Sequence, residues 1–234
     1  MTLKNAVKKA LPAGDTARTL PFGIGRGLSL TINLRAGQIS TYLGFYEMEL
    51  NRHLRRLCPR GARSFDLGGH IGYDALILAK LSGSEVLSVE SAPEYGAIIR
   101  ENLRVNPRFE NRVRIVDGYV GSGSEMPEPV GGLVTVDQLA SDYFVPDFIK
   151  MDIEGGEVAA LQGASRTLDE RRPNLLVEVH SLALEHECLE ILLSHGYEPS
   201  LVDQRRHLRD HRPTAHNRWI VAAGKPGLSV ESVS

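Results

Sequence analysis

Residues 64–81 read SFDLGGHIGYDALILAKL, and this stretch decides the fold. Its first four residues form a short apolar run typical of a buried strand, and Tyr73 to Leu81 has apolar residues at helical spacing. The turn between them contains Gly68, Gly69 and Gly72. Glycine lets a backbone approach a ligand closely, because no Cβ atom obstructs it. The stretch therefore predicts a strand, a ligand-binding turn and a helix, which together begin a parallel α/β sheet.

Strand and helix patterns alternate along the rest of the chain. Such alternation predicts a mostly parallel sheet with helices on both faces. Further strands are expected at Val86 to Val89, Val113 to Val116, Phe148 to Met151 and Leu175 to Val179. Helices are expected at Pro93 to Asn106, Val158 to Leu168 and Leu184 to His195. An antiparallel pair, Tyr197 to Val202 with Trp219 to Ala223, is expected to close the sheet.

The pattern divides the chain into three segments. We expect residues 1–60 to form an N-terminal cap or lid, residues 61–225 the main domain and residues 226–234 a flexible tail. Within the cap, Leu28 to Leu34 and Ile39 to Leu43 predict a hairpin, because both have extended patterns around a glycine-containing turn. Phe45 to Leu57 predicts a helix.

The composition is that of an ordinary globular domain. The chain has 234 residues, 42% of them hydrophobic, and a formal net charge of −2, which excludes wholesale disorder and a polycationic nucleic-acid binder. Cys58 and Cys188 form no C-x-x-C motif, so neither a zinc knuckle nor a disulfide framework is expected. No apolar run approaches the roughly 20 residues of a membrane span, and Met1 to Ala10 has no apolar stretch behind its lysines. We therefore expect a cytoplasmic protein.

Acidic residues follow three successive strands. Asp66 ends the first, Glu90 the second and Asp117 the third. A dinucleotide-binding turn would have glycine in place of Asp66, since a carboxylate repels a diphosphate. A cationic, phosphate-free nucleoside such as S-adenosylmethionine tolerates these carboxylates. Glu90 is then placed to accept hydrogen bonds from the ribose hydroxyls, and Asp117 from the adenine amino group.

The fourth and fifth strands end in candidate catalytic residues. Asp152 and Glu154 follow the fourth strand in MDIEGGE, and Glu178 and His180 end the fifth in VEVH. A carboxylate or an imidazole can accept the proton of an acceptor hydroxyl, so Asp152, His180 and Glu178 are the catalytic candidates. The same three residues are also a candidate site for Mg²⁺ or another metal ion, although their spacing alone does not demonstrate one. Glu157 is expected to be structural, because carboxylates favour the first turn of a helix.

The acceptor side has a second group of candidates. The segment Asp203 to Arg218 holds five arginines and three histidines, a composition that suits an anionic acceptor but equally a solvated loop or a contact between subunits. Near the predicted lid, aromatic residues are expected either to line the acceptor pocket or to pack against one another. The substrate-binding candidates are Tyr42, Tyr46, Glu47, Glu154, Arg205 and His216.

Five segments together resemble the FkbM family of S-adenosylmethionine-dependent methyltransferases. They are FDLGGHIGYDALILAK, VESAP, ENLRVN, IKMDIEGGEVAALQGA and PNLLVEVH, and the likeness covers roughly residues 40 to 200. The resemblance implies a class I methyltransferase fold with seven strands in the order 3-2-1-4-5-7-6 and the last strand antiparallel. It also implies O-methylation of a sugar, glycoconjugate or natural-product scaffold, with S-adenosylhomocysteine as product. The cofactor candidates are Asp66, Gly68, Gly69, His70, Gly72, Glu90, Asp117 and Asp152.

The sequence departs from the family at two positions of the turn. Gly69 and His70 stand where the family more often has Ala-Asn, so His70 must replace any contact made by that Asn. Other interpretations stay open: a non-catalytic S-adenosylmethionine-binding module, or a methyltransferase acting on RNA or on nitrogen. A nicotinamide oxidoreductase is disfavoured by Asp66, and nucleic acid by the neutral charge. A small-molecule or glycan acceptor is expected as partner, and a homo-oligomer is left open.

Overall fold

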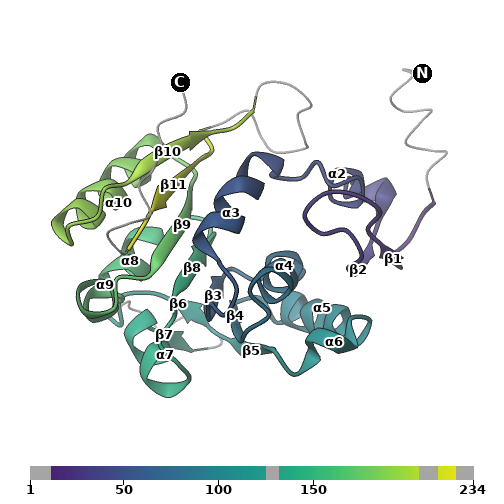
Figure 1. Ribbon diagram of the computed structural model, residues 1–234, viewed down its shortest axis with the longest axis horizontal. Helices are drawn as coiled ribbons and strands as arrows, with labels where there is room; N and C mark the ends of the chain where they lie inside the picture. Colours follow the sequence, from purple (N-terminus) through teal and green to yellow (C-terminus); the bar gives the residue numbers. More distant parts are fainter. Residues whose placement is uncertain (1–11, 125–131, 206–215, 225–234) are drawn as a thin grey trace.

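The structure is a computed structural model that describes residues 12–124, 132–205 and 216–224 (Figure 1). Its main sheet has seven strands in the order β10-β11-β9-β8-β3-β4-β5. The strands from β9 to β5 run parallel, and β11 is antiparallel to both of its neighbours. This confirms the predicted α/β sheet; counting only its own strands along the chain, the order reads 3-2-1-4-5-7-6. The strands are β3 (Ser64–Leu67), β4 (Val86–Glu90), β5 (Val113–Asp117), β8 (Phe148–Met151), β9 (Asn174–Val179), β10 (Ser200–Asp203) and β11 (Arg218–Ala222).

Helices cover both faces of this sheet, and each face has its own apolar core (Figure 1). On one face lie the N-terminal segment, α3 (Asn51–Leu57), α4 (Tyr73–Ser82), α5 (Pro93–Arg104) and α6 (Pro107–Glu110). On the other lie α7 (Val136–Asp142), α8 (Glu157–Gln162), α9 (Ser165–Glu170) and α10 (Leu182–Ser194). Among the described residues, no helix is both long enough and apolar enough to span a bilayer.

Alternation along the central strands sends apolar and polar side chains to opposite faces. Phe65 and Leu67 of β3 enter the core beneath α7–α10. Asp66 lies between them in the strand and so points to the cap side, where the register sets it opposite Ser88 and Lys150. Buried polar residues therefore form a row across the sheet, which we call the polar row. It comprises Ser88, Asp66 and Lys150, which lie opposite one another in the register, and Glu178, which lies on β9 two residues beyond Leu176, the partner of Lys150.

The N-terminal cap differs from the predicted hairpin. Strand β2 (Ser29–Ile32) pairs with the earlier β1 (Thr16–Thr19), and Ile39–Tyr42 forms helix α2 instead of a strand. The reason is local: the Asn33 side chain accepts hydrogen bonds from the backbone of Arg35 and Ala36 and starts a 3₁₀ turn, η1 (Leu34–Ala36). The chain therefore leaves the extended conformation before a second strand can begin.

Two predicted helices are also shorter than expected. The helix expected from Phe45 consists only of a 3₁₀ turn, η2 (Met48–Leu50), followed by α3. The helix expected over residues 158–168 is divided at Gly163 into α8 and α9, because Asp137 caps the start of α9 through the backbone of Arg166 and Thr167. A small parallel pair, β6 (Tyr119–Val120) with β7 (Leu133–Val134), was not predicted. The predicted tail, 226–234, and most of the arginine-rich loop, 206–215, lie outside the described residues.

Candidate functional site

A cavity of about 680 Å³ lies at the carboxyl ends of β3, β4 and β8, where parallel α/β sheets bind their ligands. Its walls come from the glycine turn, from the ends of β4 and β8, and from the cap. The predicted residues that line it are Tyr46, Gly68, Gly69, His70, Glu90, Asp152 and Glu154. The sequence motifs therefore converge on one cavity, and the cap closes part of it.

The glycine turn passes so close to β8 that side chains are excluded. A Cβ atom on Gly68, whose φ is +88°, would lie 1.8 Å from the carbonyl oxygen of Asp152. A Cβ atom on Gly69 would lie 2.3 Å from Oγ of Ser88. Gly72 lies outside the cavity lining and begins α4 with a φ of +78°. Glycine is thus required by packing at the first two positions and by backbone conformation at the third.

Glu90 ties the end of β4 to the turn. One of its carboxylate oxygens accepts the backbone N–H of His70 at 2.7 Å and the other accepts that of Ala92 at 2.8 Å. His70 adopts a left-handed conformation, φ +46°, and its ring packs edge-on against Tyr95 with 4.4 Å between centroids. Asparagine and histidine both tolerate this conformation better than most residues, which accounts for His70 at a position where the family often has Asn.

Two of the predicted acidic contacts lie elsewhere. Asp66 is fully buried beneath the turn, where it accepts a hydrogen bond from the hydroxyl of Ser88, and it does not line the cavity. Burial raises the pKa of Asp66 to about 7. Asp117 is half exposed and its carboxylate pairs with Arg100 of α5 at 2.5 Å, while the next residue, Gly118, lines the cavity. The carboxylate of Asp117 therefore pairs outside the cavity lining, and its contact with adenine stays a prediction.

A buried lysine organises the catalytic edge. Lys150 of β8 is only 3% exposed, and its ammonium lies 2.9 Å from Asp74 and 3.5 Å from Asp152. Burial opposes the lysine charge, but these carboxylates outweigh it and raise the pKa of Lys150 well above its usual value. The lysine is therefore a fixed positive charge at the floor of the cavity.

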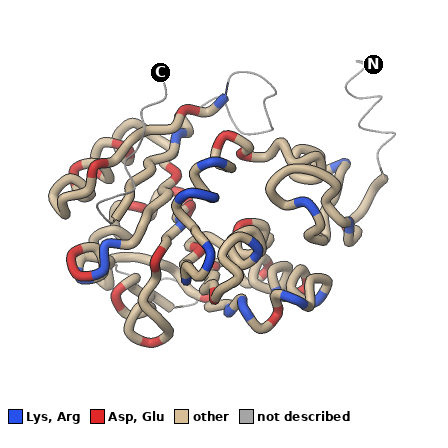
Figure 2. Tube along the Cα trace, in the orientation of Figure 1, with Lys and Arg blue, Asp and Glu red and all other residues tan. Residues whose placement is uncertain are grey.

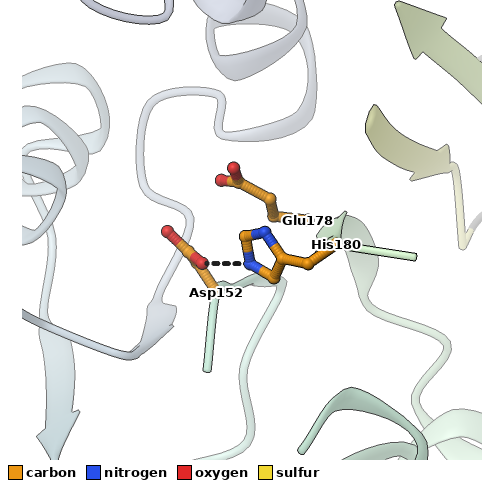
Figure 3. A group of neighbouring side chains, drawn as sticks. All are labelled: Asp152, Glu178 and His180. Atoms are coloured by element: carbon orange, nitrogen blue, oxygen red, sulfur yellow. Dashed lines mark hydrogen bonds and ion pairs between the residues drawn. The ribbon is translucent and has the colours of Figure 1, made fainter. Parts of the chain in front are cut away.

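Asp152 and His180 form a hydrogen-bonded pair at the cavity edge (Figure 3). Nε2 of His180 lies 3.2 Å from Oδ1 of Asp152. Burial would raise the pKa of Asp152, yet Lys150 and His180 outweigh it and hold that pKa below its usual value. The hydrogen bond to Asp152 in turn raises the pKa of His180 to about 9. The pair thus combines a firmly ionised carboxylate with an unusually basic imidazole.

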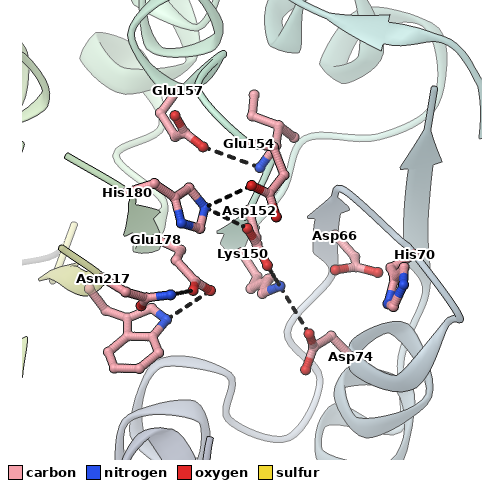
Figure 4. Close-up of polar contacts among 12 residues, drawn as sticks. Asp66, His70, Asp74, Lys150, Asp152, Glu154, Glu157, Glu178, His180 and Asn217 are labelled. Carbon is pink, nitrogen blue, oxygen red and sulfur yellow. Dashed lines mark hydrogen bonds and ion pairs between the residues drawn. The ribbon is translucent and has the colours of Figure 1, made fainter. Parts of the chain in front are cut away.

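Glu178 lies next to this pair, and residues at the start of β11 hold its side chain (Figure 4). Its two oxygens accept hydrogen bonds from Nδ2 of Asn217 at 2.8 Å and from Nε1 of Trp219 at 3.0 Å. Burial, and then the charge of Asp152, raise the pKa of Glu178 to about 7. Near neutral pH this carboxyl group can therefore hold or release a proton next to Asp152.

The same three side chains are close enough to bind a cation. Asp152, Glu178 and His180 each offer one ligand atom, and these atoms lie within 4.8 Å of one another. The ammonium of Lys150 already lies beside Asp152, however, and both oxygens of Glu178 already accept hydrogen bonds. The surroundings therefore suit proton transfer better than a divalent ion.

Four substrate candidates do not line the cavity. Arg205, at the end of β10, donates hydrogen bonds to Glu49 and to the carbonyl of Phe45 and so joins the cap to the last hairpin. His216 pairs with Glu185 of α10 at 2.9 Å. Tyr42 packs against the apolar core, and Glu47 is buried with a pKa well above its usual value, because burial disfavours its charge. Glu157, expected to be structural, is fully buried and accepts the backbone N–H groups of Ile153 and Gly155.

Sequence reasoning missed several polar residues of the site, namely Asp74, Ser88, Lys150, Asn217 and Trp219. Lys150 had a visible signal, because a lysine inside the apolar strand FIKM needs a buried partner. Asn217 and Trp219 had none, since only the pairing of β11 with β9 brings them to Glu178.

Comparison with protein families identifies the chain. The family model of the methyltransferase FkbM domain matches residues 66–199, which is more than half of the sequence. The chain belongs to the FkbM methyltransferase family. Members of this family are S-adenosylmethionine-dependent methyltransferases, and the glycine turn, Glu90 and Asp152 all fall inside the matched region. No curated protein matches the chain.

Solved structures show the same fold at low identity. The FkbM methyltransferase of Methylobacillus flagellatus KT is 23% identical with a TM-score of 0.57, over 69% of this chain and 43% of that one. The chain thus spans less than half of that protein's length. The precorrin-6y C5,15-methyltransferase of Geobacter metallireducens is 16% identical with a TM-score of 0.53, over 73% of this chain and 84% of that one. An S-adenosylmethionine-dependent O-methyltransferase of Thermotoga maritima is 15% identical with a TM-score of 0.52, over 76% and 66% respectively.

Proposed function

We propose that this FkbM-family methyltransferase methylates a hydroxyl group on a sugar, a glycoconjugate or a natural-product scaffold. The observation that carries the proposal is the hydrogen bond of 3.2 Å between His180 and Asp152 at the edge of the cavity. An alcohol is a weak nucleophile, so its methylation needs a positioned base, and this pair provides one.

The cavity walls fit S-adenosylmethionine. When bound, this cofactor supplies an electrophilic methyl group on a sulfonium. Asp74, Glu90 and Asp152 line the cavity with carboxylates, which favour a cationic ligand. Glu90 keeps lone pairs for ribose hydroxyls although it accepts two backbone N–H groups. Gly68 and Gly69 both line the cavity, so a cofactor bound there would meet backbone and not side chains at the turn.

The proton of the acceptor hydroxyl is assigned to His180. With a pKa of about 9, the neutral imidazole is a stronger base than an ordinary histidine, and Asp152 stabilises the imidazolium that forms. Lys150 fixes the position of Asp152 through its ion pair. Glu178 supplies a second titratable group next to Asp152, through which the proton can move on. The acceptor would bind between this edge and the cap residues Tyr46 and Thr41.

The acceptor is proposed to be a small molecule or a glycan and the location cytoplasmic. Two buried cysteines, Cys58 and Cys188, are free of disulfides, which suits a reducing compartment. Arg205 and His216 already pair with acidic residues of the protein, so the described part of the basic loop gives no support to an anionic acceptor.

The test separates binding from turnover. His180→Ala should bind S-adenosylmethionine nearly as the wild type does, because it leaves the glycine turn and all the cavity carboxylates in place. Asp152→Asn keeps the glycine turn and Glu90, so it should still bind the cofactor, weakened only by the loss of one of the cavity carboxylates. Both should lose about two orders of magnitude or more in kcat, the usual contribution of a positioned base. Turnover is measured as S-adenosylhomocysteine released with a panel of sugar and polyol acceptors, and binding by calorimetry. His186→Ala, at an exposed histidine of α10, is the matched control and should stay fully active.

Three other results would contradict the proposal. Normal turnover of both variants would remove the pair from the mechanism. Binding of S-adenosylmethionine by the wild type without turnover on any acceptor would favour the non-catalytic module. Loss of wild-type turnover in a chelator, with recovery when Mg²⁺ or Mn²⁺ is added, would show that Asp152, Glu178 and His180 bind a catalytic metal ion. We expect activity to persist in the chelator, because Lys150 lies beside Asp152.

A further inference from the structure

The outer side of the cap carries a stripe of exposed side chains, which begins with a methionine and continues with two arginines. Met48 in η2 and Arg52 and Arg55 in α3 are spaced four and three residues apart, and α3 continues η2 with helical dihedral angles at Asn51. This spacing sets the three side chains on one side of the helix. All three are exposed, Met48 by 39%.

A neighbouring loop continues the stripe. Phe22 and Arg26 lie in the tight loop between β1 and β2, and Phe22 is 59% exposed. Lys80 of α4 anchors this loop by donating hydrogen bonds to the carbonyls of Ile24 and Arg26, at 2.8 and 2.7 Å. Burial lowers the pKa of Lys80, and nearby guanidiniums lower it further; these belong to Arg108, Arg55 and Arg26. Lys80 thus ties α4 to the loop, and Arg55 of α3 lies close enough to lower the pKa of Lys80.

Apolar side chains lie beside these cations. Phe45 is 39% exposed and follows Gly44, whose backbone packs directly on that of Phe22 and Gly23. Three residues later comes Met48, at the start of the stripe. The apolar and basic side chains thus meet on one surface, which we call the cap face. It comprises Phe22, Phe45, Met48, Arg26, Arg52, Arg55, Lys80 and Arg108.

Among the residues that the structure describes, the cations of the cap face have no carboxylate within ion-pair distance. Within the described parts of the chain, Arg26, Arg52, Arg55, Lys80 and Arg108 form no ion pair, whereas Arg100, Arg114, Arg205 and Arg218 each pair with a carboxylate. Figure 2 shows blue segments along α3 and others in the N-terminal segment that carries β1 and β2. Since the whole chain has a net charge of −2, this local excess of positive charge is offset by acidic residues elsewhere.

We propose that the cap face binds the surface of an anionic lipid bilayer. Basic side chains beside a negatively charged bilayer add attraction for each charge, and exposed aromatic and methionine side chains can enter the boundary of the acyl chains. A nucleic acid would use the cations but would leave Met48 without a role, and the acidic remainder of the chain would repel a long polyanion. The combination of exposed apolar and basic side chains therefore favours lipid.

The experiment is sedimentation of the full chain with vesicles of phosphatidylcholine, with and without phosphatidylserine. The wild type should sediment with the phosphatidylserine vesicles only, and less so as salt is raised. Arg55→Glu changes two charges and should weaken binding roughly 30-fold. Phe22→Ser should weaken binding while leaving its salt dependence unchanged. Arg171→Glu, at an exposed arginine after α9, makes the same change in net charge and should bind as the wild type does.

Retained binding of S-adenosylmethionine by each variant shows that it is folded. The proposal is overturned if the wild type fails to sediment with phosphatidylserine vesicles, or sediments equally with pure phosphatidylcholine. It is also overturned if Arg171→Glu loses as much binding as Arg55→Glu, because net charge alone would then be responsible. Tight retention of a DNA duplex without lipid binding would assign the cap face to nucleic acid instead.

Discussion

Glu90 is the carboxylate that holds the turn and that we propose also contacts the cofactor. Its two oxygens hold the backbone of His70 and Ala92, which fixes the shape of the cavity before any ligand binds. The side chain is 7% exposed and lines the cavity, so its remaining lone pairs are directed to a ligand there. The turn and the acidic strand end are therefore one unit, and a change at Glu90 should affect cofactor binding first.

Glu90→Ala should weaken the affinity for S-adenosylmethionine by about 1.5–3 kcal/mol, the scale of hydrogen bonds to a charged group. Calorimetric titration measures the change. Asp117→Ala is the matched control, because Asp117 pairs with Arg100 outside the cavity and its loss should leave the affinity nearly unchanged. Equal losses in the two variants would show that both acidic strand ends contact the cofactor.

The pair of His180 and Asp152 predicts how the rate depends on pH. Because Asp152 raises the pKa of His180 to about 9, most of the imidazole is protonated at neutral pH and cannot accept a proton. The value of kcat should therefore rise with pH until about pH 9. Nuclear magnetic resonance of the histidine ring should show the same titration, moved to lower pH in Asp152→Asn. A wild-type ring that titrates at the ordinary histidine value would disprove the coupling.

At the scale of elements, the sheet could be predicted because its signals are local. Each central strand is a short apolar run next to a helix pattern, and the glycines of the turn point to the ligand-binding end. The cap could not be predicted in the same way. Its strand β1 pairs with β2 across a loop, and the capping by Asn33 ends the extended segment, so both depend on contacts that no periodic pattern records.

For the candidate site, as for the sheet, the positions that could be predicted are those with a local signal in the sequence. Residues at strand ends, such as Glu90, Asp152 and His180, follow from parallel strands ending at one edge. Arg205 was expected near the acceptor from the charge of its loop, whereas the structure shows its guanidinium paired with Glu49, 156 residues away in the sequence. Composition indicates that a loop is basic, whereas only the tertiary fold decides which carboxylate it meets.

Arg205→Ala should loosen the junction between the cap and the β10–β11 hairpin. The ion pair with Glu49 is largely buried, with side-chain exposures of 16% and 10%, so its loss leaves a poorly solvated carboxylate and should cost about 1–3 kcal/mol of unfolding free energy. Denaturant unfolding measures this change, and hydrogen exchange should show faster exchange around Glu49. Arg114→Ala breaks an exposed pair with Glu85 and should cost less than about 1 kcal/mol. Equal costs would mean that the junction does not hold the cap.

For the whole molecule, the polar row is the main departure from an ordinary sheet core. Asp66, Lys150 and Glu178 are buried between the sheet and the cap, where apolar side chains would pack with no desolvation cost. Lys150 brings charge to the floor of the cavity, and Asp66 and Glu178 are buried on the same face of the sheet, so we infer that the fold gives up stability to prepare the site. The cost should depend on pH, because it arises only when the buried carboxyl groups ionise.

Asp66 allows this cost to be measured. Its pKa is about 7 in the folded protein and about 4 in an unfolded chain, so between these values the folded state holds the proton more tightly. The unfolding free energy should therefore fall as pH rises from about 4 to 7, and stay lower above 7. In Asp66→Asn no proton is released, so the variant should gain up to a few kcal/mol on the wild type over the same range. The gain is measured as the difference in unfolding free energy between Asp66→Asn and the wild type, each determined by urea unfolding at a series of pH values.

Asp117→Asn is the control for that series, since Asp117 is half exposed and its replacement should not produce a gain between pH 4 and 7. Glu178 also has a raised pKa, so part of the pH dependence should remain in Asp66→Asn and disappear only when Glu178→Gln is added. If the curves of the wild type and Asp66→Asn run parallel from pH 4 to 8, Asp66 keeps its ordinary pKa in the fold. The stability cost of the site would then lie with Glu178 and its neighbours alone.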